Sequence, residues 1–287
     1  KIDTTWMGLQ FEYTPFKNSG VFVLDEATLA GVYEALDEHE LVLQATMGNR
    51  FMGYFEPQIL AWRVKLATVR STLDSWIEVQ RAWCSLESIF IGSEDIREQL
   101  PEDAKRFDSV DGDFKEQMAD AKNTPSPLEA CLKEGRAEAM SRCQAGLDLC
   151  QKSLADYLET KRKKFPRFYF ISAADLVDVL SKGKHPPAVQ EHFSKFTDNM
   201  GGIIWDKDAE TGAEIGVCKG MFATDKERVP FPMDFECRGP VEVWLTVLMA
   251  NCINNFRDLG LLAREKHRKG RHEEIRELHE ANLARTG

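Results

Sequence analysis

The chain has 287 residues, of which 43% are hydrophobic and 29% are charged, and its formal net charge is −10. This length and composition are typical of a globular protein with one large domain or two ordinary ones. The acidic balance argues against a general nucleic-acid-binding protein, because such proteins neutralise phosphates with Lys and Arg. No apolar run approaches the roughly 20 residues that a membrane-spanning helix needs, so neither nucleic acid nor a membrane is expected as a partner.

The start of the chain and its cysteines bear on its origin. The sequence begins at Lys1 and shows no signal-peptide pattern, so we expect a fragment of a longer cytosolic protein. The number of cysteines is odd and no CxxC pair occurs, which favours reduced thiols in or near a core over a disulfide framework. The seven cysteines are Cys84, Cys131, Cys143, Cys150, Cys218, Cys237 and Cys252.

The N-terminal stretch predicts a short hairpin followed by a helix. "LQFEY" and "VFVL" flank "KNSG", and Gly20 is available for a left-handed turn position. Asp25 is placed to cap a helix. Its apolar residues at helical spacing are Leu29, Val32, Tyr33 and Leu36.

A seven-residue repeat of large side chains predicts one very long helix from Gln58 to Phe90. No Gly or Pro interrupts this range, which would be about 50 Å long at about 1.5 Å per residue. The repeat consists of Trp62, Val69, Trp76, Trp83 and Phe90, with Ile59, Leu66 and Leu73 three positions earlier. A stripe so rich in Trp is expected in a core, and Gly92 is expected to end the helix.

Two further helices follow in the next seventy residues. The first begins near Pro101 and places Phe107, Val110, Phe114 and Met118 on one face. After a loop at Asn123–Pro127, a second long helix covers roughly Gly135 to Lys164. Its stripe consists of Met140, Leu147 and Leu154, with Cys143, Cys150 and Tyr157 three positions later.

The cluster "KRKK" at residues 161–164 ends that second long helix, just before Pro166. Cations in a last turn complement the negative end of the helix dipole, and this structural role is the favoured interpretation. The alternative is a binding site for an anion.

The following segment joins short helices. "FPRFYFIS" (residues 165–172) forms a brief aromatic strip, and Ser172 with Asp175 forms a capping box for a new helix that Gly183 ends. Pro186 and Pro187 are expected to open another helix. Its apolar residues are Val189, Phe193 and Phe196.

The pattern changes to strands after Gly201. "IIW" and "EIGVCKGMF" surround "DKDAETG", and "VPF" follows "TDKE", which predicts a small antiparallel patch whose prolines confine the last segment to an edge. Pro240 then starts a helix with a wide apolar face. A basic break at "REKHRKGRH" (residues 264–272) is expected to separate it from a final amphipathic helix that carries Ile275 and Leu278.

A search for chemistry finds no constellation that supports catalysis. The sequence contains neither a phosphate-binding GxxxxGK[ST] loop nor GxGxxG, HExxH or GxSxG. "DSVDGD" and "DKDAETG" do not fit a calcium loop, and His185 and His192 lack further ligands at metal spacing. No catalytic residue, cofactor-binding residue or metal ligand is therefore predicted.

Three longer blocks resemble the linker region of dynein heavy chains. They are "WIEVQRAWCSLESIFIGSEDIREQLPEDAKRFDSVDGDFKEQM", "CQKSLADYLETKRKKFPRFYFISAADLVDVL" and "KGMFATDKERVPFPMDFECRGPVEVWL". They occur in the family's order from about Trp76 to Leu245, and "MGNRFMGYFEPQILAWRVKL" upstream fits as well. "GSEDIREQLP" is more similar to axonemal than to cytoplasmic dyneins. Phe114 departs from the Trp that the family often carries there, but keeps a large apolar ring.

The resemblance implies a mechanical function. The dynein linker is a helical rod lying across a ring of six ATPase modules; it bends when the ring binds and hydrolyses ATP, and its straightening is the power stroke. The first nucleotide loop of the family lies beyond Gly287, so the chain is expected not to be an enzyme and to hold no cofactor, with ATP and Mg in the parent motor. The implied partners are the AAA+ ring of the same heavy chain, other dynein chains and, through the parent motor, microtubules. The implied location is the cytoplasm and cytoskeleton, in the axoneme of a cilium or flagellum.

The expected architecture is mainly α: an elongated stack of helical bundles with a small antiparallel β-hairpin patch in the C-terminal third. Residues 1–164 would form a bundle with two long helices, and residues 165–287 a second helical part that contains the patch and leads towards the first AAA+ module. The aromatic strip at 165–172 would lock the joint between bundles so that strain passes through it.

Three aromatic residues of the patch are candidate contacts with the ring: Trp205, Phe222 and Phe231. The alternative is that all three are packed under the hairpins. A competing function is a static helical scaffold or tethering protein, although such proteins usually show internal repeats and none is evident here.

Overall fold

The computed structural model describes residues 1–17, 19–48, 52–198 and 200–286, and for residues 52 and 272–286 only the backbone. The chain forms two compact units, Lys1–Asp156 and Tyr157–Gly287, whose boundary falls inside the helix α7. Most of the described residues are helical, and a three-stranded antiparallel sheet lies in the C-terminal part. The prediction of a mainly α fold with a small antiparallel patch is confirmed. The division at residue 164 stays a prediction.

The first unit is a helical bundle with one two-stranded hairpin. Its elements are α1 (Ile2–Gly8), β1 (Tyr13–Phe16), β2 (Val21–Leu24), α2 (Glu26–Met47), η1 (Met52–Tyr54), α3 (Glu56–Phe90), α4 (Glu94–Gln99), α5 (Pro101–Lys122), α6 (Pro127–Leu132) and the larger part of α7 (Arg136–Lys164).

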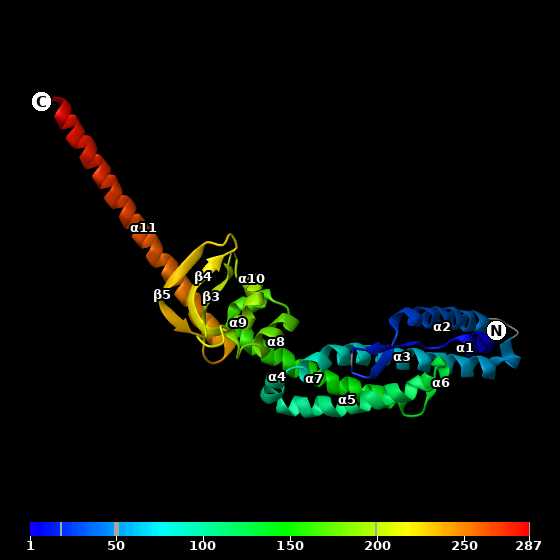
Figure 1. Ribbon diagram of the computed structural model, residues 1–287. Coiled ribbons are helices and arrows are strands. Elements are labelled where there is room, and N and C mark those ends of the chain that lie inside the picture. The colour runs from blue at the N-terminus through cyan, green and yellow to red at the C-terminus, as the bar shows by residue number, and fades with distance from the viewer. Residues whose placement is uncertain (18, 49–51, 199, 287) are drawn as a thin grey trace. The chain divides into compact units, whose positions relative to one another are not determined.

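The long helix α3 has 35 residues and forms the centre of this unit, between α2 and α5 (Figure 1). Trp76, Trp83 and Phe90 are fully buried, as their seven-residue spacing predicts, whereas Trp62 at the start of the repeat is half-buried. The Trp83 Nε1 donates to Asp111 Oδ1 of α5 at 3.0 Å. Burial of such large rings makes the Trp stripe a large apolar contribution to the unit.

The predicted hairpin forms, but its first strand, β1, begins slightly later in the chain than the sequence indicates. Strand pairing starts at Tyr13, because the backbone N–H of Phe11 donates to Pro125 O (2.8 Å) and its ring packs edge-on against Trp76. Gly20 adopts φ +74°, as the predicted turn requires. The Asp25 Oδ1 accepts from the N–H of Ala27 at 3.0 Å, so the predicted helix cap is confirmed.

Arg136 is a buried charge at the start of α7. Its guanidinium donates to Gln117 O (2.8 Å) and Ala130 O (3.2 Å) and pairs with Asp120 (2.6 Å). The same group lies 4.9 Å from the ring centroid of Trp76. One side chain therefore connects α3, α5, α6 and α7 through hydrogen bonds, an ion pair and a cation–π contact.

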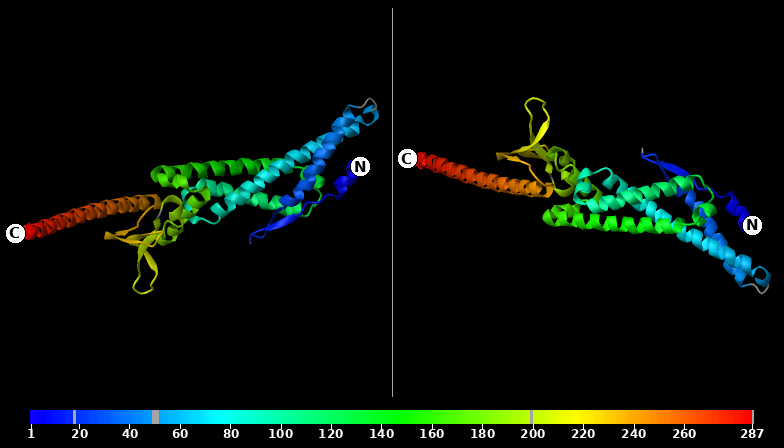
Figure 2. Two further views of the ribbon diagram at one scale, coloured as in Figure 1. Left: turned by 90° about the horizontal axis from the view of Figure 1, so that it is seen from above. Right: turned by 90° about the horizontal axis from the view of Figure 1, so that it is seen from below.

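The second unit combines short helices, a sheet and one long helix. Besides the end of α7, it contains η2 (Pro166–Phe170), α8 (Ala173–Ser181), α9 (Pro186–Val189), η3 (Gln190–His192), α10 (Phe193–Phe196), β3 (Met200–Lys207), β4 (Glu214–Ala223), β5 (Arg228–Glu236) and α11 (Val241–Thr286). The turn between β3 and β4 projects from the rest of this unit (Figure 2).

The sheet has the strand order β3-β4-β5 with antiparallel pairing throughout. The segment with Pro230 and Pro232 is an edge strand, as predicted, because proline has no N–H for a second ladder. Register shifts between Ile204 and Asp206, and between Cys218 and Gly220, interrupt the pairing. Such bulges increase the local twist, which allows this small sheet to curve over α11.

Two expectations for the helices of this unit are wrong. The helix expected after Pro186 is divided into α9, η3 and α10, because i→i+3 bonds close its turns from Ala188 to Phe193. The break expected at residues 264–272 does not occur, since α11 runs without interruption from Val241 to Thr286. A single glycine such as Gly270, with no proline beside it, destabilises a helix by only about 1 kcal/mol and does not end it.

Among the residues that the structure describes, no helix combines the length and the apolarity that crossing a bilayer requires.

Candidate functional site

The basic cluster at the end of α7 is part of a buried ion pair. Glu242, in the first turn of α11, has 1% of its side chain exposed, and its Oε1 lies 2.8 Å from Lys161 Nζ and 3.6 Å from Lys164 Nζ. Burial acts to raise the pKa of Glu242, but the hydrogen bond from Lys161 and the two positive charges outweigh it and hold the pKa below its ordinary value. The cluster thus ends a helix, as predicted, and also binds α11.

Half of the aromatic strip, which follows this helix end in the chain, is buried. Phe165 and Phe168 are buried with ring centroids 4.8 Å apart, and both lie edge-on to Phe196 of α10. Tyr169 and Phe170 of the same η2 turn are exposed. We call the four buried residues Phe165, Phe168, Phe196 and Glu242, together with Lys161, the α7–α11 joint.

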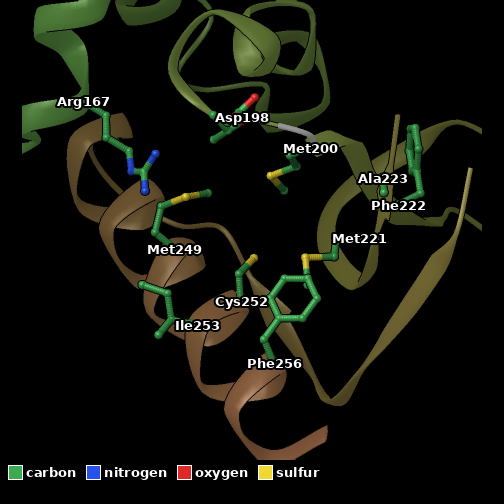
Figure 3. Close-up of a pocket in the computed structure, with 11 residues that line it drawn as sticks. Arg167, Asp198, Met200, Met221, Phe222, Ala223, Met249, Cys252, Ile253 and Phe256 are labelled. Carbon is green, nitrogen blue, oxygen red and sulfur yellow. The ribbon is translucent and has the colours of Figure 1, made fainter. Parts of the chain in front are cut away.

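Next to the joint, the second unit has an open apolar pocket of about 420 Å³. Figure 3 shows α11 forming one wall and the start of β3 with the end of β4 forming the other. The lining residues are Arg167, Thr197, Asp198, Met200, Met221, Phe222, Ala223, Met249, Cys252, Ile253 and Phe256. Below, "the apolar pocket" means this set.

The chemistry of the apolar pocket suits an apolar side chain rather than a reacting group. Three methionines give it soft, adaptable walls, and Ile253 and Phe256 are exposed at 62% and 55%. Charge is confined to Arg167 and Asp198, and Arg167 Nη1 donates to Phe196 O at 3.0 Å. Burial raises the pKa of the Cys252 thiol to about 11, so that it stays protonated at neutral pH. Methionine and aromatic side chains of this kind are enriched at protein–protein interfaces, and apolar concave pockets also occur as ligand sites.

Of the three aromatic residues expected to contact a ring, Phe222 lines the apolar pocket. The Phe222 ring lies over Gly201 and Gly202 of β3, where an added Cβ would come within 2.9 Å and 2.7 Å of ring atoms. The absence of side chains at these two glycines therefore leaves room for the Phe222 ring. The ring is half-buried.

Trp205 and Phe231 are not presented on the surface. Trp205 is 5% exposed and its Nε1 donates to Gln190 Oε1 at 2.8 Å, while Phe231 is 9% exposed on β5. Both belong to the core under the hairpins, which is the alternative considered from the sequence. The contact of all three residues with a ring stays a prediction.

Sequence reasoning did not identify the α11 wall of the pocket. Met249, Ile253 and Phe256 lie on the wide apolar face expected after Pro240. That face is wider than the core covers, since Ile253 and Phe256 are exposed. The extra width of this apolar face could have indicated the pocket wall from the sequence, because a helix that packs on one side only needs a narrower apolar stripe.

His192 has carboxylates near it that its sequence spacing does not reveal. Asp178 and Glu191 bring ligand atoms close to the His192 ring, with Nε2 2.6 Å from Asp178 Oδ2. The ammonium of Lys182 also contacts both carboxylates. We interpret the group as an ion-pair network that ties α8 to η3, because a lysine already neutralises the carboxylates that a metal would use.

Comparison with known proteins identifies the family. Residues 1–260 match the family model described as dynein heavy chain, N-terminal region 2. The chain belongs to the dynein heavy chain family. The resemblance stated from the sequence is confirmed, including the axonemal type.

Three relatives illustrate the match of this dynein heavy chain region. It is 44% identical over 249 residues to a ciliary dynein beta chain of Heliocidaris crassispina, covering 87% of this chain and 6% of the relative. It is 41% identical over 253 residues to dynein axonemal heavy chain 9 of Homo sapiens, covering 88% and 6%. It is 43% identical over 250 residues to the flagellar outer arm dynein beta chain of Chlamydomonas reinhardtii, covering 85% and 5%.

The chain thus spans about one-twentieth of the length of these dynein heavy chains. The remainder of such a heavy chain lies outside the structure.

Proposed function

We propose that this region is the mechanical linker of an axonemal dynein heavy chain. In this proposal it bends and straightens across the AAA+ ring of the same chain and so couples ATP hydrolysis to force on microtubules. The region itself is not catalytic: ATP and Mg are bound elsewhere in the parent motor. Its place is the axoneme of a cilium or flagellum, together with other dynein chains.

The α7–α11 joint is the observation that carries the proposal. A lever must transmit strain from one helix to the next without yielding, and dense, fully buried contacts compress little. At the joint, a buried carboxylate held by Lys161 connects the end of a 29-residue helix to the start of α11. A cluster of three edge-on aromatic rings connects the same helix end and the η2 turn to α10. This is the construction that load transfer requires.

The apolar pocket is the surface on which we place the contact with the ring. The occupant is an apolar side chain from the AAA+ ring of the same heavy chain, because most of a chain of the relatives' length lies outside the structure. Phe222 and Phe256 would bury their free faces on closure. Each such aromatic contact contributes about 1–2 kcal/mol, which suits an interface that must form and break in every cycle.

The test uses the whole heavy chain motor with Phe222→Ala and, separately, Phe256→Ala. We expect slower microtubule gliding, while ATP turnover persists because the ATPase modules are untouched. The matched control is Phe170→Ala, which removes an aromatic that is 75% exposed in the same unit and does not line the pocket. Gliding at the unaltered speed in both folded pocket variants would contradict the docking assignment.

A second measurement separates the lever from the static scaffold. Structures of the parent motor in two nucleotide states should show this region in two positions relative to the ring. A single position in both states would favour the scaffold. ATP hydrolysis by the isolated chain, abolished by point substitutions within it, would refute the non-catalytic assignment.

A further inference from the structure

Two buried thiols meet at the boundary between the sheet and α11. Cys218 Sγ of β4 lies 3.4 Å from Cys237 Sγ, which follows β5 directly. Cys218 is fully buried and Cys237 is 8% exposed. The linker role proposed above does not use this pair.

The strand register explains why these thiols meet. Val217 pairs with Glu236, and the N–H of Cys237 donates to Gly216 O at 2.8 Å. Cys237 is therefore opposite Gly216, and Cys218, two residues further along β4, lies on the same face. The two cysteine side chains are therefore diagonal neighbours on adjacent antiparallel strands, which is close enough for their sulfurs to meet.

We propose that Cys218 and Cys237 are a modification site: a dithiol pair that a low-molecular-weight disulfide, such as oxidised glutathione, converts to an intrachain disulfide. The two sulfurs need to approach by about 1.4 Å to reach the S–S bond length of about 2.05 Å. Side-chain rotation can supply a movement of this size without a change of strand pairing.

The reaction proceeds in two exchange steps. The Cys237 thiolate, on the more accessible residue, attacks one sulfur of the reagent, which forms a mixed disulfide and releases one reduced thiol. The Cys218 thiolate then attacks the Cys237 sulfur and releases the second reduced thiol. The two protons that the cysteines give up are taken up by the two released thiolates, and two electrons pass from the cysteine pair to the reagent.

The environment sets the rate of this chemistry. The hydrogen bond with Cys237, together with burial, raises the pKa of Cys218 strongly, so the pair reacts through brief openings of the β5–α11 connection and faster at higher pH. Once formed, the bond closes a loop over residues 218–237 and joins β4 to the connection that enters α11. The bond thus links β4, whose end forms part of one wall of the apolar pocket, to the segment that leads into α11, which forms the other wall.

The experiment treats the purified chain with excess oxidised glutathione at about pH 8, near the range in which free thiols ionise. Peptide mapping without reductant should yield one linked pair, Cys218 with Cys237, lighter by two hydrogen atoms and restored by dithiothreitol. Hydrogen exchange in β4 and β5 should slow in the oxidised chain. Cys218→Ser and Cys237→Ser should each abolish the linked pair, and Cys252→Ser should leave it unchanged.

Cys143 and Cys150 provide a control within the same molecule. Both are buried, but seven residues of helix separate them by about 10.5 Å, too far for a disulfide. Three results would overturn the proposal: no Cys218–Cys237 link in the folded wild-type chain, a lasting glutathione adduct on Cys237 in its place, or a link that appears only after unfolding in urea.

Discussion

The Lys161–Glu242 ion pair allows a sharp test of how the α7–α11 joint is stabilised. The perturbation is a double-mutant cycle with Lys161→Met, Glu242→Leu and the double variant. Because Glu242 is 1% exposed, removing Lys161 leaves a buried carboxylate with only Lys164 Nζ at 3.6 Å, on a side chain that is 63% exposed. An uncompensated buried charge costs about 3–5 kcal/mol, and partial compensation by Lys164 reduces this to about 2–3 kcal/mol.

The other two variants of the cycle should lose different amounts of stability. Glu242→Leu leaves Lys161, whose flexible stem can turn its ammonium towards water, so we expect a loss of about 1–2 kcal/mol. The double variant replaces both charges by apolar groups of similar size and should lose at most about 1 kcal/mol. The pair therefore should show a coupling free energy of about 2–5 kcal/mol, the sum of the single losses less that of the double variant.

Hydrogen exchange of the peptide covering residues 241–256 measures the free energy of opening at this place in the chain. Lys163→Met is the matched control, an exposed lysine of the same helical turn, and should change the value by less than about 0.5 kcal/mol. A double variant whose loss equals the sum of the single losses would refute the reasoning. It would mean that the two side chains act independently.

The same pair predicts a pH dependence. Since the pKa of Glu242 is lower in the folded chain than its ordinary value of 4.5, its contribution to stability is fully present above that value and is lost as pH falls through the folded-state pKa. In Lys161→Met this acid-side loss should shrink, because the hydrogen bond that lowers the pKa is gone.

Three further predictions concern other parts of the fold. Trp83→Ala should lower the free energy of unfolding in urea by about 3–5 kcal/mol, and Trp62→Ala, at a half-buried site, by clearly less; equal losses would contradict the assigned stripe. Arg136→Met should lower the free energy of unfolding by about 3 kcal/mol, because Asp120 and two backbone carbonyls lose their hydrogen-bond donor. An unchanged free energy of unfolding would show that water replaces the guanidinium. Ser172→Ala should cost about 1 kcal/mol through loss of the α8 cap, measured by thermal unfolding, whereas Ser172→Asp should retain most of the stability.

Local signals in the sequence predicted much of this fold. The repeat Trp76, Trp83 and Phe90 indicated a long buried helix, and Asp25 and Ser172 marked helix starts, because spacing and capping act over a few residues. The prolines of β5 indicated an edge strand for the same reason. Each of these features is a property of one segment.

What the sequence did not reveal depends on segments that are distant in the chain. Glu242 is 81 residues from Lys161, and nothing near either residue indicates the pairing. The apolar pocket combines η2, the sheet and α11, so its lining could not be assembled from periodicity alone. Trp205 and Phe231 looked similar to Phe222 in the sequence, and only the packing of Gln190 and of the strands separates them.

The placement of the six tryptophans has a practical consequence. Trp62, Trp76 and Trp83 lie on α3 in the first unit with Trp6, whereas Trp205 and Trp244 lie in the second. Replacing the last two by Phe would leave an indole fluorescence signal that reports only on the N-terminal bundle, and the reciprocal set would report only on the C-terminal part. Emission from two such proteins would show, without any attached dye, which half of the molecule melts first.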